Sequence, residues 1–135
     1  MYKNILVPVS FEESRNVDQA IQAAKTLLSD GGKVTLLHVL QDIPNYVSDH
    51  IPSDLLAANR DEIKARVDKL AESVPGAAGH VVNGHPGNTI LSWADDHDVD
   101  CIVVASHQPA MSDYLLGSTA QMVVRHAKCC VHVVR

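Results

Sequence analysis

Short apolar runs alternate along this chain with segments of helical periodicity. Three runs, at residues 5–9, 34–40 and 101–105, are dominated by Ile, Leu and Val and are bounded by polar residues. Runs of this kind are typical of strands that are buried on both faces of a parallel sheet. Weaker runs at residues 80–84 and 131–134 predict two further strands, so that five strands are expected in all.

Between these runs, apolar residues recur at spacings of three and four, as they do on one face of an amphipathic helix. The first predicted helix carries this stripe as far as Leu28 and ends at the pair Gly31-Gly32. A second helix is expected over about 54–74. Further helices are expected to start near Pro86 and at Gly117.

The regular alternation of strands and helices predicts an α/β fold. Parallel strands joined by right-handed helical crossovers form an open sheet with helices on both faces. We expect a single Rossmann-like domain spanning residues 1–135, with five parallel strands in the order 3-2-1-4-5. Residues 41–53 contain two prolines and mixed polarity, and predict a loose excursion after the second strand.

The carboxyl ends of the first, second and fourth strands are the expected ligand site, because open α/β sheets bind ligands where the strand order reverses. These ends fall at residues 8–10, 38–40 and 105–107. Gly117, Ser118 and Thr119 open the last helix, where unpaired N–H groups and the helix dipole favour an anion. A phosphate contact at Ser118 and a simple helix cap by its hydroxyl remain alternatives.

Charge and hydropathy exclude several functional classes. The net charge is -5 and the sequence shows no basic stripe, which argues against a nucleic-acid partner. No apolar run approaches the roughly 20 residues of a membrane span, so no membrane insertion is expected. Residues 1–10 are too short and too interrupted by Pro8 for a signal peptide, which predicts a cytoplasmic protein.

The sequence predicts no catalytic or metal site. His107 could transfer protons, but no Ser-His-Asp or Cys-His set accompanies it, and we expect it to orient its loop or contact a ligand. The 8 histidines and 3 cysteines lack the spacing of metal ligands or of a disulfide framework.

Four stretches carry a resemblance to a known family: "KNILVPVS", "VTLLHVL", "NGHPGNTILSWADDHDVDCIVVASH" and "LLGSTAQMVVRHAKCCVHVVR". In this order and spacing, over nearly the whole chain, they resemble the universal stress proteins. Nucleotide-binding members carry Gly-x-x-Gly, nine residues and then Gly-Ser or Gly-Thr. Here Ala105 and Gln108 replace the first two glycines, and Gly117-Ser118 matches. The variant "ASH-x-P" followed by "YLLGS" is similar to the F/G-type subgroup, which is associated with nucleotide binding.

The resemblance implies a stress-response protein with a regulatory or sensing role that binds ATP, or ADP or AMP, at the carboxyl ends of the strands. It implies no enzymatic activity beyond slow ATP hydrolysis at most. The alternative is a family member that binds no nucleotide and acts through its dimer and partner contacts. The loop from His107 to Asp113 has no Lys or Arg, and Gln108 stands where subgroup relatives often carry Arg, so modest affinity is expected.

The implied contacts follow the parts of the nucleotide, with adenosine at the ends of the first two strands, ribose and phosphates along the loop after the fourth, and phosphate at the last helix. The residues are Pro8, Val9, Ser10, Val39, Ala105, Ser106, His107, Gln108, Pro109, Gly117, Ser118 and Thr119. Ser10 occupies a position often held by Asp, so Mg²⁺ could accompany the nucleotide, but without that carboxylate. Family members also commonly pair their last strand with a twofold mate, which implies a homodimer through Val131–Arg135. The alternative is a monomer whose edge Lys128 and Arg135 protect.

Overall fold

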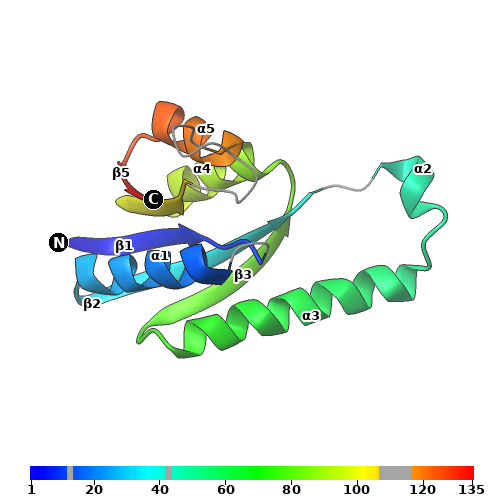
Figure 1. The fold of residues 1–135 in the computed structure, drawn as a ribbon, viewed down its shortest axis with the longest axis horizontal. Coiled ribbons are helices and arrows are strands. Elements are labelled where there is room, and N and C mark those ends of the chain that lie inside the picture. Colours follow the sequence, from blue (N-terminus) through cyan, green and yellow to red (C-terminus); the bar gives the residue numbers. More distant parts are fainter. Residues whose placement is uncertain (12–13, 42–43, 107–116) are drawn as a thin grey trace.

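A computed structural model spans residues 1–135, and the structure is described for all of these residues except 12–13, 42–43 and 107–116. All strands lie parallel in one sheet with the order β3-β2-β1-β4-β5 (Figure 1). This confirms the predicted fold and strand order. The strands are β1 (Tyr2–Pro8), β2 (Leu28–Leu40), β3 (Ala77–Asn83), β4 (Cys101–Ala105) and β5 (Cys130–Val134).

Helices cover both faces of the sheet. They are α1 (Ser14–Leu27), α2 (Asn45–Ser48), α3 (Ser53–Glu72), α4 (Pro86–Asp96) and α5 (Ser118–His126). The buried residues of α1 and α3 pack with one face of the sheet, and those of α4 and α5 pack with the other. Successive residues of β1 serve both layers, since Ile5 and Val7 belong to the first core and Leu6 to the second. β1 and β4 therefore read as continuous apolar runs.

The boundary between α1 and β2 differs from the prediction. Leu28 begins β2 instead of closing the helix, and Gly31 and Gly32 lie inside the strand. Pairing with β1 is shifted here, because Tyr2 pairs with Leu28 while Asn4 pairs with Lys33. Gly31 has a φ of 77°, a conformation that favours glycine. The two glycines thus serve an irregular start of β2 and not the end of a helix.

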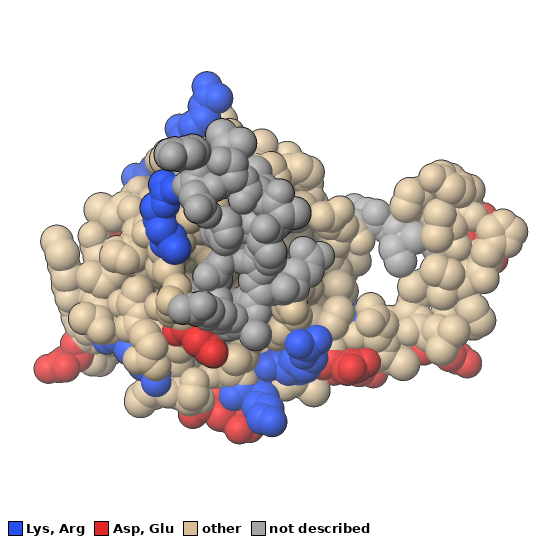
Figure 2. All heavy atoms as spheres, in the orientation of Figure 1, with Lys and Arg blue, Asp and Glu red and all other residues tan. Residues whose placement is uncertain are grey.

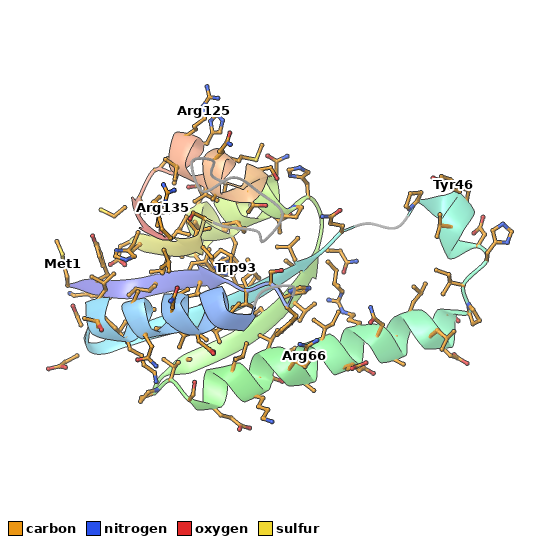
Figure 3. All side chains as sticks on the ribbon, in the orientation of Figure 1. Met1, Tyr46, Arg66, Trp93, Arg125 and Arg135 are labelled. Atoms are coloured by element: carbon orange, nitrogen blue, oxygen red, sulfur yellow. The ribbon has the colours of Figure 1, made fainter. Side chains whose placement is uncertain are left out.

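The described part of residues 41–53 contains a short helix that the sequence did not predict. This helix is α2, and α3 begins at Ser53. The first half of α3 projects beyond the sheet together with α2 (Figure 1), and the buried residues of α3 are Val67 and Ala71, both in its second half. We call residues 44–62 the arm. Tyr46, at the far end of the arm in Figure 3, is 73% exposed.

Asp100 joins the beginning of β1 to the turn that precedes β4. Its carboxylate accepts the backbone N–H groups of Lys3 and Asn4, at 2.9 and 3.0 Å. The side-chain amide of Asn4 donates to the carbonyl oxygens of His97 and Asp98. These contacts hold the tight turn in which Asp98 has a φ of 53°.

Trp93 packs beside the second core. Its ring stacks on that of His97 with 4.0 Å between centroids, and His80 of β3 lies 4.9 Å away. The indole Nε1 is buried and has no hydrogen-bond partner among the described residues. His80 is exposed, but partial desolvation, followed by the charge of Lys64, lowers its pKa.

β5 lies at the edge of the sheet, as predicted, beside β4. The cysteines are free thiols in three environments: Cys101 is buried, Cys129 is half-buried and Cys130 is exposed. Burial raises the pKa of Cys101 to about 11, so that this thiol stays protonated at neutral pH. Within the described part of the chain, no helix combines the length and apolar character needed to cross a membrane.

Candidate functional site

A cavity of about 500 Å³ lies at the carboxyl ends of β1, β2 and β4, where the strand order reverses. This is the place at which open α/β sheets bind ligands. The described lining consists of Pro8, Val9, Ser10, Val17, Leu37, His38, Val39, Gln41, Pro86, Ile90, Val104, Ala105, Ser106, Gly117, Ser118, Thr119 and Ala120. The cavity is of the size that small-molecule sites have.

The floor of the cavity is the top of the apolar core. Leu37 and Ile90 are at most 2% exposed, and Val104 is 3% exposed. Because the core packs these side chains tightly from below, the floor is rigid and preformed. Polar groups stand at its rim, where Ser10, Gln41 and Ser118 are exposed. An apolar floor with a polar rim suits a flat, partly apolar ligand that carries polar substituents.

The start of α5 forms one wall of this cavity. Gly117 is the N-cap residue, and no side chain caps the helix among the described residues, so the alternative in which Ser118 serves as cap is not observed. The N–H groups of a first helical turn have no acceptor within the helix, and the helix dipole adds positive potential there. With the hydroxyl groups of Ser118 and Thr119, this wall can hold an anion.

The described surroundings of Gly117 do not require a glycine at this position. Its φ is -60° and its ψ is 158°, a conformation open to any residue. Among the described residues, a Cβ at this position would meet only the carbonyl oxygen of Ser106, at an ordinary 3.6 Å. Gly87 differs, because a Cβ there would collide with the side chain of Met122, where α4 packs on α5. The missing side chain at Gly117 therefore widens the cavity and relieves no clash.

His38 forms part of the opposite wall and connects it to the end of β1. Its Nδ1 lies 2.8 Å from the carbonyl oxygen of Val9, and since a carbonyl only accepts, Nδ1 carries the proton. Its ring also lies 5.2 Å from that of Phe11, over which the Arg66 guanidinium sits at 4.1 Å. His38 thus packs on Phe11 and lines the cavity as well.

The structure brings the described residues of the predicted site together around this one cavity. Nine line it: Pro8, Val9, Ser10, Val39, Ala105, Ser106, Gly117, Ser118 and Thr119. His107, Gln108 and Pro109 lie outside the described residues. Sequence reasoning missed the apolar floor, together with Gln41 and Pro86. Both positions follow directly from the topology, since Gln41 is the first residue after β2 and Pro86 opens α4.

The described lining contains no Lys, Arg, Asp or Glu, and His38 is its one titratable side chain. Among the described residues there is also no group of three or more His, Cys, Asp or Glu that could hold a metal ion. The described lining thus offers backbone dipoles, hydroxyls and one imidazole to a ligand, and it contains no carboxylate, ammonium or guanidinium group.

Fold and site together define a doubly wound α/β protein with a preformed ligand cavity at its switch point. The sequence model of the Universal stress protein family matches residues 1–135. The chain belongs to this family.

Individual relatives agree with this assignment. The chain is 30% identical over 142 residues to Universal stress protein G of Escherichia coli O157:H7, and the match covers 100% of both chains. This confirms the resemblance to the F/G-type subgroup. The structure of Universal stress protein UspA from Lactobacillus plantarum is similar with a TM-score of 0.76 and 30% identity, over 99% of this chain and 98% of that one.

Two more distant solved structures share the fold and are nucleotide complexes. One is a universal stress protein in complex with cAMP, with a TM-score of 0.61, 24% identity and coverage of 99% of this chain and 97% of that one. The other, from Archaeoglobus fulgidus, is in complex with dAMP, with a TM-score of 0.66, 18% identity and coverage of 99% and 98%. Structural relatives of this chain therefore bind adenine nucleotides.

Proposed function

We propose that this protein binds an adenine nucleotide, ATP or else ADP or AMP, in the cavity and serves as a regulator or sensor in the stress response. One observation carries the proposal: the fold needs no glycine at Gly117, yet the residue leaves the wall of the cavity open beside an uncapped helix start. A phosphate group placed there would meet N–H groups and hydroxyls. The relatives solved with cAMP and dAMP are consistent with this ligand class.

The apolar floor completes the proposed site. Adenine would lie over Leu37, Val39 and Ile90, with its ribose between the ends of β1 and β4. Stacking an aromatic base on aliphatic side chains removes apolar surface from water, which supplies much of the binding free energy. Mg²⁺ could accompany the nucleotide at Ser10, where a hydroxyl would replace a carboxylate ligand.

No catalytic step belongs to the proposed function. A general base needs an acceptor close to the reacting water, and within the described lining His38 is the candidate. Its Nδ1 donates to the Val9 carbonyl and not to a carboxylate, and the described lining contains no Asp or Glu that could assist it. We therefore propose a binding protein in which any hydrolysis of ATP is slow.

Calorimetry with ATP, ADP and AMP tests the proposal directly. Nucleotide that co-purifies with the native protein and is released on denaturation would support it. Gly117→Val should abolish binding, because the side chain fills the space beside the helix start while the backbone stays in an allowed conformation. Ala58→Val, on the exposed face of the arm, adds comparable bulk away from the cavity and should bind as the parent does.

Two outcomes would contradict the proposal. The first is the absence of co-purified nucleotide together with no heat of binding at high ATP concentration. The second is unchanged affinity in a folded Gly117→Val variant, which would place the site elsewhere. Circular dichroism of both variants separates loss of binding from loss of folding.

The absence of Lys and Arg from the described lining favours a second candidate function. A family member that binds no nucleotide would act through its dimer and partner contacts, and it would have no need of cations in the cavity. Failure of all three nucleotides to bind, with a folded protein, would support this alternative.

We further propose a homodimer through Val131–Arg135. β5 is an edge strand, and an unpaired edge is open to pairing with a second copy. Light scattering coupled to gel filtration should give the mass of a dimer, and Val133→Pro should reduce it toward that of a monomer by removing an N–H donor. A monomer at high concentration would refute this assembly.

A further inference from the structure

The lack of charged side chains in the described lining bears on how many phosphate groups a ligand can carry. Phosphate sites usually contain Lys or Arg, because charge-assisted hydrogen bonds are the strong ones. The described lining contains neither. The sequence adjoining it carries net negative charge, since residues 107–116, "HQPAMSDYLL", contain Asp113 as their one charged residue, and residues 11–16 contain two Glu, at 12 and 13, against Arg15.

Three described arginines are candidates for a cation near the cavity, and all three lie or make their contacts elsewhere. Arg66 covers the ring of Phe11, which also contacts His38. Arg60 donates to Asn83 and to the carbonyl oxygen of Val81, at the end of β3. Arg125 stands in the last turn of α5, away from its start (Figure 3), and Figure 2 shows blue Lys and Arg side chains spread over the surface of the viewed face. None of these three residues lines the cavity.

The start of α5 therefore supplies the positive potential within the described site. A helix N-terminus corresponds to roughly half an elementary charge, and its effect falls off within the first turn. A phosphate monoester carries about -1.5 to -2 at neutral pH, and a cyclic phosphodiester carries about one negative charge. The N–H groups and hydroxyls of this wall can serve one phosphate group, whose charge the helix dipole offsets only in part, and each further phosphate adds charge that meets no cation of the described lining.

Longer phosphate chains also lack a metal ligand here. Mg²⁺ would offset part of the charge of ATP, and protein sites usually anchor it with one or two carboxylates. No carboxylate lines the described cavity, and Ser10 stands where an Asp would serve. The net charge of -5 adds long-range repulsion to each additional phosphate.

We propose that the cavity selects adenine nucleotides by charge and binds them in reverse order of phosphate number. AMP and cyclic AMP bind tighter than ADP, and ADP binds tighter than ATP. The inference rests on the proposed function, since it concerns the same site and the same base. It names the ligand class more narrowly as the adenine monophosphates.

Calorimetry with the full-length protein at fixed ionic strength tests this order. We expect ATP to bind roughly tenfold more weakly than AMP, since an unmatched charged group costs about as much as one charge-assisted hydrogen bond contributes. Higher ionic strength should narrow the gap between AMP and ATP, because salt screens the repulsion. Repeating the titrations with Mg²⁺ should leave the order unchanged.

A charge added at the rim should change the order. Ser118→Arg places a cation at an exposed lining residue beside the helix start, and should tighten ATP binding relative to AMP by roughly tenfold. Asn59→Arg makes the same change in net charge on the arm, which does not line the cavity, and should keep the parent order.

The outcomes separate this inference from the proposed function. Binding of ATP as tight as that of AMP, or tighter, overturns charge selection while leaving nucleotide binding intact. If Ser118→Arg and Asn59→Arg change the relative affinities for ATP and AMP equally, the charge selection does not originate in the cavity wall. If no adenine nucleotide binds to any of these folded proteins, the proposed function fails and this inference fails with it.

Discussion

The backbone N–H of Gly117 donates to the carbonyl oxygen of Ser106 across 2.8 Å and so joins the start of α5 to the end of β4. Ser106 is 3% exposed, so its carbonyl is a buried acceptor. A buried backbone group that loses its partner costs free energy comparable to a lost hydrogen bond. This contact should therefore contribute measurably to the free energy of unfolding.

Replacing Gly117 tests this contact with a matched pair of variants. Gly117→Pro keeps the observed φ of -60° but removes the donor, whereas Gly117→Ala keeps both. We expect Gly117→Pro to unfold with about 1–3 kcal/mol less free energy than Gly117→Ala in urea titrations. Equal stability of the two variants would show that the hydrogen bond contributes nothing.

Asp100 should be important for stability although it lies far from the cavity. Its carboxylate accepts two backbone N–H groups at the start of β1. Asp100→Ala leaves both donors without their partner, and we expect a loss of about 2–3 kcal/mol in denaturant unfolding. Asp96→Ala, an exposed site on α4, is the control and should change the free energy by less than about 0.5 kcal/mol. A small effect at Asp100 would mean that water replaces the carboxylate without cost.

His80 should make stability depend on pH. Partial desolvation, and then the charge of Lys64, lowers its pKa in the folded state, so the unfolded chain binds the proton more readily; because His80 is exposed to solvent, the effect on stability is small. The free energy of unfolding should be highest at pH values above the pKa of His in the unfolded chain, about 6.5, and should decline as the pH falls below it.

Two variants test this pH dependence. The decline in the free energy of unfolding should be smaller in His80→Gln than in the parent, while His50→Gln, on the exposed connection before α3, should keep it. Fluorescence of the single Trp93, beside His80, can follow each unfolding curve; identical pH profiles for all three proteins would exclude His80 as a source.

Gly87 should tolerate no side chain while Met122 is present. A Cβ at Gly87 would overlap the Met122 side chain, including its stem. We expect Gly87→Ala to cost about 1–3 kcal/mol through overpacking between α4 and α5. The same substitution should cost less in a Met122→Ala background, because the space it needs is then open. Additive effects in the double variant, measured by denaturant unfolding, would contradict this packing.

Much of the fold was predictable because burial on both faces leaves a clear signal in the sequence. β4 matches its predicted range of 101–105, since an interior strand admits few polar residues. The error at the end of α1 has a physical cause. Leu28 packs against the same core as the helix, so its apolar character continues the helical stripe although the chain has already turned into β2. Periodicity reports which side a residue faces and does not report where the hydrogen-bonding pattern changes.

The candidate site could be predicted at its rim but not at its floor. The strand ends around Val9 and Ala105 follow from the topology rule for open sheets, and Gly117-Ser118 from the rule for helix starts. Leu37 and Ile90 carry no such mark, because an aliphatic residue beneath a ligand looks the same in the sequence as one beneath another side chain. Only the packed structure separates these two environments.

Ser106 occupies a position with consequences for the outer edge of the sheet. Its N–H donates to the carbonyl oxygen of Val134 on β5, and its own carbonyl accepts from Gly117. Ser106 thus links the outermost strand, β5, to the helix α5 at the cavity through two backbone hydrogen bonds. A displacement of β5 or of α5 is therefore transmitted to the other, which couples the edge of the sheet to the rim of the cavity.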